Sequence, residues 1–451
     1  MSRFLLRKNS TLFCFLYIAL CVAIALGGTK KEASKYTDPK YDLSSLWEDF
    51  DRILTTLEDR SAEEQYKKRG ADITPWMKDT ALPSPDNAAL LYYQAFLLQP
   101  EPNEATIIRM SEVLRGSEPD KTIRIYLGHC LETIHLTELA SQMPQCAWGI
   151  RYQPGSGFKE YVLGSKVRSL ALILATDART LAADGHHRAA LERCLTICRL
   201  ARHVRNDTIF LHILSNTLDN MAQSTIQHVL GIMPPDADTL TWLQGQLTAV
   251  QGAHRSLESV LEVEFRLALQ NIHDNPKTII RWKKELTEKT VEDESAKKEI
   301  KEVLSLTDEE LIARARESYS KFLNSFLRAM GSDMPYEKKY AELQSLINKL
   351  KKSTSDPTTM LGIAPRIMVR YYELQVRHKA NFNALRAAIE IFLTAAKTGQ
   401  LTEKLPENLP KDPYSGQDFD YEITQEGFVL RCREKSIGDN KIWEYEFIIV
   451  Q

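Results

Sequence analysis

The stretch ARTLAADGHHRAALERCLTICRLA, residues 178–201, decides the fold class. Its apolar residues recur every three or four positions on both sides of Asp184-Gly185, which is the spacing of amphipathic helices. The second run carries one apolar face, formed by Ala190, Cys194, Cys198 and Ala201. Because Gly favours tight turns, we expect the two runs to form an antiparallel helical hairpin, a unit of helical bundles and α-solenoids.

This hairpin resembles half of a tetratricopeptide repeat. Gly185 stands five residues before Ala190, and Cys194 occupies the usual aromatic position four residues further on. The resemblance ends there, because no repeat period of about 34 residues recurs along the chain. The predicted fold class is therefore mainly α, with antiparallel helical hairpins in a bundle or an irregular, weakly tetratricopeptide-like α-solenoid.

The helical period extends over most of the chain, and residues 46–275 are predicted to form a helical body. Within it, Asp86 is expected to cap one helix, and another helix is expected over Thr122–Ser141. Three successive helices are predicted between Gly164 and Leu230, and Pro234-Pro235 ends the third.

Charged residues dominate the end of the body and the region after it. The last helix of the body carries three neighbouring glutamates: Glu258, Glu262 and Glu264. On an amphipathic helix we expect them to face solvent rather than to form a paired-carboxylate site. Residues 276–357 are rich in Lys and Glu, and Thr307 and Glu310 form a capping box. This region is predicted to be a charged helical hairpin insertion, with either a solvated face or a partner-docking role.

Residues 1–28 have the layout of an export signal. Arg3, Arg7 and Lys8 precede an uncharged run from Leu12 to Leu26, which is shorter than the roughly 20 apolar residues of a spanning helix. We therefore expect a cleaved signal peptide or an N-terminal membrane anchor formed by residues 12–28. Residues 29–45 are polar and are predicted to be a tether. The protein is thus expected to be exported to the periplasm or the cell envelope.

The composition limits the kinds of partner. With 58 Lys and Arg against 60 Asp and Glu, the net charge is −2, so no nucleic-acid partner is expected. Five cysteines lie outside the leader: Cys130, Cys146, Cys194, Cys198 and Cys432. Their low density argues against a disulfide scaffold. Either Cys130 and Cys146 pair in an oxidising compartment, or all five are small buried apolar residues.

The pattern changes from helical to alternating after Gly399. Residues 358–451 are predicted to hold a long helix followed by a three-stranded antiparallel sheet, with strands at about 419–424, 428–432 and 444–450. Gly427 is expected to supply a positive φ in the first turn. The sheet is too small to be stable alone, so its apolar face is expected to pack on the helix. The residues expected on that face are Tyr421, Ile423 and Val429.

The turn 409–414, LPKDPY, resembles that of the major pseudopilins of type II secretion, as do Gly416 and Tyr421 after it. In that family a long helix runs into the same turn and a three-stranded sheet, so the resemblance implies this architecture for about residues 380–451. Here the helical body separates the leader from the module, and Thr29-Lys30-Lys31 follow Gly28, so we do not expect a filament subunit. The whole chain also resembles uncharacterised exported bacterial proteins that join an α-helical body to this module.

The pseudopilin resemblance also implies a calcium site in the loop before the last strand. Here that loop is SIGDN, residues 436–440, and its weak candidate ligands are Asp439 and Asn440. Calcium takes about six to eight oxygen ligands. We therefore predict no bound metal.

The strings HExxH, GxSxG, GxxxxGK[ST] and GxGxxG do not occur in the chain. We therefore predict no catalytic residue and no cofactor. The segment 146–158, CAWGIRYQPGSGF, mixes aromatic residues with Gly and Pro and is predicted to be a binding loop. Its candidate contact residues are Trp148, Arg151, Tyr152 and Phe158.

Together these patterns predict a non-catalytic binding or scaffold protein, exported or tethered at the envelope. Its partner is expected to be a protein or peptide, and its membrane contact is expected only through the N-terminal segment. Two alternatives stay open. The LPKDP turn fits a component of a secretion or pilus-like assembly, and the loop 146–158 fits a hydrolase of an unrecognised kind.

Overall fold

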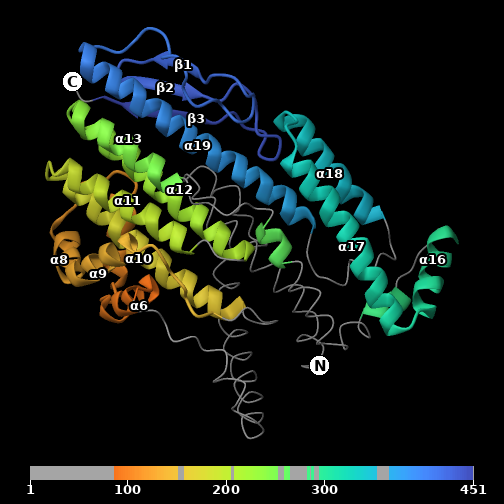
Figure 1. Cartoon of the computed structure of the whole chain (residues 1–451). Coiled ribbons are helices and arrows are strands. Elements are labelled where there is room, and N and C mark those ends of the chain that lie inside the picture. Colours follow the sequence, from red (N-terminus) through yellow and green to blue (C-terminus); the bar gives the residue numbers. More distant parts are fainter. Residues whose placement is uncertain are drawn as a thin grey trace, which may run out of the picture.

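The structure is a computed structural model that describes residues 86–150, 157–204, 208–251, 259–264, 282–284, 286–288, 294–352 and 365–449. In these ranges the protein is mainly helical, with a small antiparallel sheet near the C-terminus (Figure 1). The predicted fold class is confirmed at this level. The leader 1–28 and the tether 29–45 lie outside the described residues.

The first helices are α6 Ala88–Leu98, α7 Glu104–Val113, α8 Lys121–His129, α9 Leu131–Gln142, α10 Gly157–Ala183, α11 His187–Val204, α12 Ile209–Ile232 and α13 Ala237–Gln251. They are followed by α16 Glu294–Ser305, α17 Asp308–Gly331, α18 Tyr336–Lys352 and α19 Pro365–Thr398. The strands are β1 Asp420–Ile423, β2 Gly427–Arg431 and β3 Glu444–Ile448.

The helices α10, α11 and α12 pack against one another (Figure 1). They match the three helices predicted between Gly164 and Leu230. Gly185 adopts φ +81° in the connection between α10 and α11, a conformation that glycine reaches without steric cost. Cys194 and Cys198 are buried on the apolar face of α11, as the spacing predicted. All five thiols outside the leader are free, so Cys130 and Cys146 do not form a disulfide.

Two helix boundaries differ from the sequence prediction. The helix expected over Thr122–Ser141 is two helices, α8 and α9, which meet at Cys130. Gly128 lies just before this break, and its low helix propensity weakens the last turn of α8. The cap of α6 is Asn87 rather than Asp86, because the Asn87 side chain accepts a hydrogen bond from the backbone N–H of Ala89.

The charged helices α16, α17 and α18 lie to one side of the α10–α13 helices (Figure 1). The predicted capping box is present at the start of α17. The Glu310 backbone N–H donates to Thr307 Oγ1, and the Thr307 backbone N–H donates to the Glu310 carboxylate. The helices α17 and α18 pack together, and α18 also contacts α19.

The sheet has the strand order β1-β2-β3, with both pairs antiparallel. Phe392 of α19 contacts Phe428 and Phe447 with ring centroids 5.5 and 6.3 Å apart, so the sheet packs on the long helix as predicted. Two details of the prediction are wrong. Ile423, expected to pack on the helix, is 43% exposed. Val429 pairs with Glu422 and therefore lies on the opposite face from Tyr421, because neighbouring residues of a strand alternate between faces.

The turn that carries the pseudopilin resemblance is built around Asp412, which is fully buried. Its carboxylate accepts hydrogen bonds from the Tyr414 backbone N–H (2.9 Å), the Ser415 hydroxyl (2.7 Å) and the Arg433 backbone N–H (2.9 Å). Arg433 follows β2, so Asp412 ties the turn to the sheet. The side chain therefore has a structural role, which explains why Asp fits this position.

Candidate functional site

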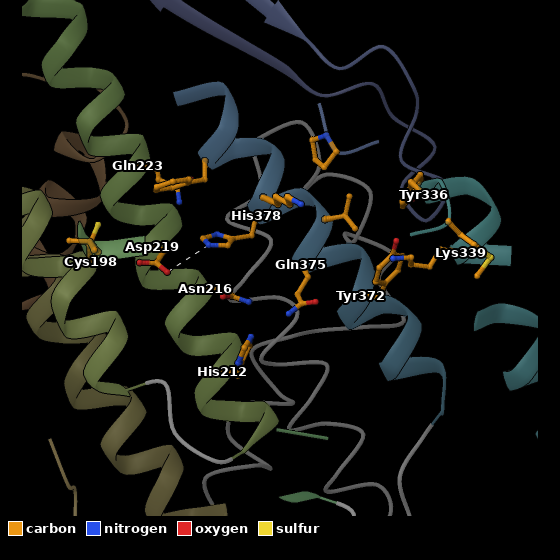
Figure 2. Close-up of a pocket in the computed structure, with 16 residues that line it drawn as sticks. Cys198, His212, Asn216, Asp219, Gln223, Tyr336, Lys339, Tyr372, Gln375 and His378 are labelled. Atoms are coloured by element: carbon orange, nitrogen blue, oxygen red, sulfur yellow. Dashed lines mark ion pairs between the residues drawn. The ribbon is translucent and has the colours of Figure 1, made fainter. Parts of the chain in front are cut away.

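The candidate site is a cavity of about 500 Å³ between α12 and α19 (Figure 2). Residues from α11, α13 and α18, together with Met334 and Pro413 from loops, complete the described part of its wall. Figure 2 shows Asp219, Gln223 and Cys198 towards one end of the cavity and Tyr336, Lys339 and Tyr372 towards the other. The volume lies in the range of roughly 300–1,000 Å³ that is usual for small-molecule sites.

One wall is a row of polar side chains on α12. The row consists of His212, Asn216, Asp219 and Gln223. Spacings of four, three and four residues place them on one face of the helix, since an α-helix has about 3.6 residues per turn. All four side chains are at least nine-tenths buried. Polar groups buried without partners are costly, so such a row needs partners from the protein or from a ligand.

The opposite wall is α19, which runs parallel to α12 and in register with it. The His212 and Tyr371 rings meet edge to face with centroids 5.4 Å apart. Seven residues further along each helix, His378 Nε2 lies 3.7 Å from Asp219 Oδ2. The same offset places Gln375 opposite Asn216, and both residues line the cavity. The two helices thus present a ladder of facing polar residues.

His378 is held from both ring nitrogens. Its Nδ1 lies 3.2 Å from Asn220 Oδ1, which also accepts a hydrogen bond from Asn381 Nδ2 (3.2 Å). Its Nε2 faces the Asp219 carboxylate. These two partners fix the orientation of the imidazole at the middle of the cavity. A ligand can hydrogen-bond the ring only by sharing or replacing its contact with Asn220 or Asp219.

Gln223 stands out among the wall residues. It is 6% exposed, and its Oε1 has no hydrogen-bond partner among the described residues. A buried amide oxygen without a donor costs about 1–3 kcal/mol. A ligand N–H or O–H at this point of the cavity would satisfy it.

The far end of the cavity is aromatic. The Tyr336 and Tyr372 rings stack with centroids 6.2 Å apart, and both residues are less than one-tenth exposed. Lys339 Nζ donates to the Met330 carbonyl at the end of α17 (2.9 Å). At this end of the cavity the lining side chains are therefore held in place by ring stacking and a hydrogen bond within the protein.

Cys198 is the thiol in the cavity wall, and its chemistry argues against covalent catalysis. Burial, reinforced by the neighbouring Asp219 carboxylate, raises its pKa well above the ordinary value of a thiol. The thiol stays protonated at neutral pH, and a protonated thiol is a poor nucleophile.

The predicted binding loop lies elsewhere and is only partly described. Trp148 is 4% exposed, stacks on Tyr92 with ring centroids 5.2 Å apart, and donates from Nε1 to the His203 carbonyl (2.7 Å). Its indole is thus part of the core. Arg151 and Tyr152 lie outside the described residues, and Phe158 lies in the first turn of α10 with its side chain outside the description.

The weak metal candidates have other contacts. Asp439 Oδ1 accepts a hydrogen bond from Arg370 Nη1 (2.6 Å) in an ion pair with it. Asn440 adopts φ +50° in the turn before β3. In the ranges that the structure covers, no three His, Cys, Asp or Glu side chains cluster as metal ligands would.

One predicted solvent-facing carboxylate is not solvent-facing. Glu264 is half-buried, and its carboxylate accepts a hydrogen bond from the backbone N–H of Ile209 at the start of α12 (2.8 Å). Burial raises its pKa. Glu262 is exposed as expected, and Glu258 lies outside the described residues.

Sequence reasoning missed the α12–α19 cavity. A partial signal was present, because four of the polar residues of α12 recur at four-three-four spacing, although other polar residues of the helix surround them. That spacing predicts a polar stripe on a helix, but it does not say whether solvent or another helix covers the stripe.

No protein-family model, no curated protein and no solved structure matches this chain. Within the described ranges, no helix has the length and apolar composition needed to cross a membrane.

Proposed function

We propose that this chain is a non-catalytic binding protein that holds a small polar ligand in the α12–α19 cavity. The observation that carries the proposal is the buried polar row of α12, which faces polar residues of α19 across the cavity. The protonated state of Cys198 supports binding over covalent chemistry. We further propose that residues 1–28 deliver the body to the periplasm or envelope, by cleavage or as an anchor.

For the body we propose a bundle rather than an α-solenoid. In a solenoid each repeat contacts only its sequence neighbours. Here α12 and α13 both pack against α19, which lies more than 100 residues further along the chain, and this contact between sequence-distant helices fits a bundle better.

A thermal-shift screen of the full chain against sugars, amino acids, short peptides and nucleosides tests the binding proposal. A true ligand raises Tm in the wild type but not in Gln375→Trp, which fills the cavity from α19. The control is Gln400→Trp, which places the same side chain at an exposed position just after α19. If no compound raises Tm, or if Gln375→Trp leaves the shift unchanged, the proposal is wrong.

A role in a secretion or pilus-like assembly is the second candidate. It is supported by β1, which occupies one edge of the described sheet and exposes Ile423. A strand at a sheet edge offers backbone groups for pairing with another chain. Ile423→Lys should then block assembly or secretion without altering Tm, and unaltered secretion would remove this candidate.

A further inference from the structure

We infer, on the basis of the proposed function, that the ligand of the α12–α19 cavity is a short peptide recognised through its backbone amides. Three carboxamide side chains line the cavity: Asn216 and Gln223 on α12, and Gln375 on α19. A carboxamide offers both N–H donors and a carbonyl acceptor, which is the pattern of a peptide unit. Because these carboxamides lie on both α12 and α19, they can hydrogen-bond the backbone N–H and C=O groups on both edges of an extended peptide.

Gln223 provides the independent observation. Its side chain is nine-tenths buried in the cavity wall, and its Oε1 has no hydrogen-bond partner among the described residues. This acceptor requires an N–H or O–H donor from whatever fills the cavity. A backbone N–H of a peptide meets the requirement without bringing a charge.

The dimensions set the length of the peptide. Asn216 and Gln223 are seven residues apart on α12, or about 10 Å at a rise of about 1.5 Å per residue. An extended chain advances about 3.3 Å per residue, so this distance corresponds to about three residues. A cavity of about 500 Å³ is also suited to a ligand of this size.

The remaining wall favours a peptide over the two other common classes of polar ligand. No arginine, the residue that binds oxyanions through two parallel hydrogen bonds, is among the described residues that line the cavity. Two lysines line it, but Lys339 Nζ donates to the Met330 carbonyl and Lys379 is exposed. The Tyr336 and Tyr372 rings stack on each other rather than presenting a common face to the cavity, which disfavours stacking against a sugar.

The test is isothermal titration of the full chain with acetyl-Ala-Ala-Ala-amide and with its analogue in which the central amide is an ester. The ester keeps the shape but lacks one N–H. We expect the tripeptide to bind and the ester to bind roughly tenfold more weakly, because a buried acceptor stays unpaired. Gln223→Leu should weaken binding of the tripeptide to the level of the ester and remove the difference between them.

The matched control is Gln227→Leu, one turn further along α12. Gln227 donates to the Glu446 carbonyl of β3 and does not line the cavity. This variant should retain tripeptide binding even where Tm falls. Equal affinities for amide and ester, or full binding by Gln223→Leu, would overturn the inference.

The outcomes also separate this inference from the proposed function. If maltotriose binds in a Gln375-dependent manner and the tripeptide does not, the peptide inference is wrong while the cavity remains a binding site. If neither probe binds and the wider screen also fails, both proposals are wrong.

Discussion

The hydroxyl of Tyr336 in α18 donates a hydrogen bond to Glu373 Oε2 in α19 (2.5 Å). The same hydroxyl accepts a hydrogen bond from the Ile437 backbone N–H (2.9 Å), and the Ser436 hydroxyl donates to the other oxygen of Glu373. Glu373 is 1% exposed. One buried cluster thus joins the charged helices, the long helix and the loop before β3.

Tyr336→Phe should loosen α18 from α19. The change leaves the Glu373 oxygen and the Ile437 N–H without their shared partner, which costs about 1–3 kcal/mol. Urea unfolding should show this loss, and amide hydrogen exchange should show it concentrated in α17 and α18. Tyr340→Phe, one turn further along α18, is the control. Equal effects of the two variants would show that the hydroxyl of Tyr336 does not hold α18 against α19.

Gly427→Ala should strongly destabilise the C-terminal sheet. A Cβ at this position would lie 2.0 Å from the Phe447 carbonyl oxygen, and Gly427 has φ +158°. The obstacle is backbone, so no rotamer change relieves it, and we expect a loss of about 2 kcal/mol or more. Gly245→Ala is the control, because a Cβ there meets nothing within 4 Å. A Gly427→Ala variant with wild-type Tm would contradict the pairing of β2 with β3.

Stability should fall on acidification because of two partly buried histidines, His203 and His228. His203 Nδ1 lies 2.9 Å from the Tyr92 hydroxyl, and its Nε2 lies 3.0 Å from the Met143 carbonyl. Burial lowers the pKa of His203 to about 4, and burial also lowers that of His228 to about 4. In the unfolded chain a histidine titrates near pH 6.5.

The folded state thus favours the neutral imidazoles, while the unfolded chain takes up protons first as the pH falls. The stabilisation is complete above about pH 6.5 and is lost progressively between about pH 6.5 and 4, by roughly 1–3 kcal/mol per histidine. Urea unfolding of His203→Gln across this range should show a smaller pH dependence than the wild type. His129→Gln, at an exposed position, should retain the wild-type dependence. An unchanged slope in His203→Gln would contradict the assignment.

Asp412→Ala should destabilise the LPKDPY turn by about 2–4 kcal/mol. The change removes the acceptor of three hydrogen bonds from a fully buried position. Asp418→Ala is the control, since its ion pair with Lys411 is exposed and is worth at most about 1 kcal/mol. Thermal unfolding compares the two, and comparable losses would show that Asp412 does not hold the turn to the sheet.

The sequence by itself determined the local structure. The hairpin around Gly185, the capping box of Thr307 and Glu310, and the three C-terminal strands follow from periodicity, caps and turn residues. These features depend on residues a few positions apart, so a linear pattern contains them. The same patterns were less reliable at boundaries, as the break at Cys130 shows.

Only the tertiary structure decided the candidate site. Asp219 and His378 are far apart in the chain, and their proximity depends on the parallel register of α12 and α19. Periodicity can place His212, Asn216, Asp219 and Gln223 on one helix face, but burial of that face against a second helix is a long-range packing outcome. For the same reason Trp148 appeared as a loop contact in the sequence and is a core residue in the fold. The sequence of a helix determines which side chains share a face, whereas tertiary packing determines which residues that face contacts.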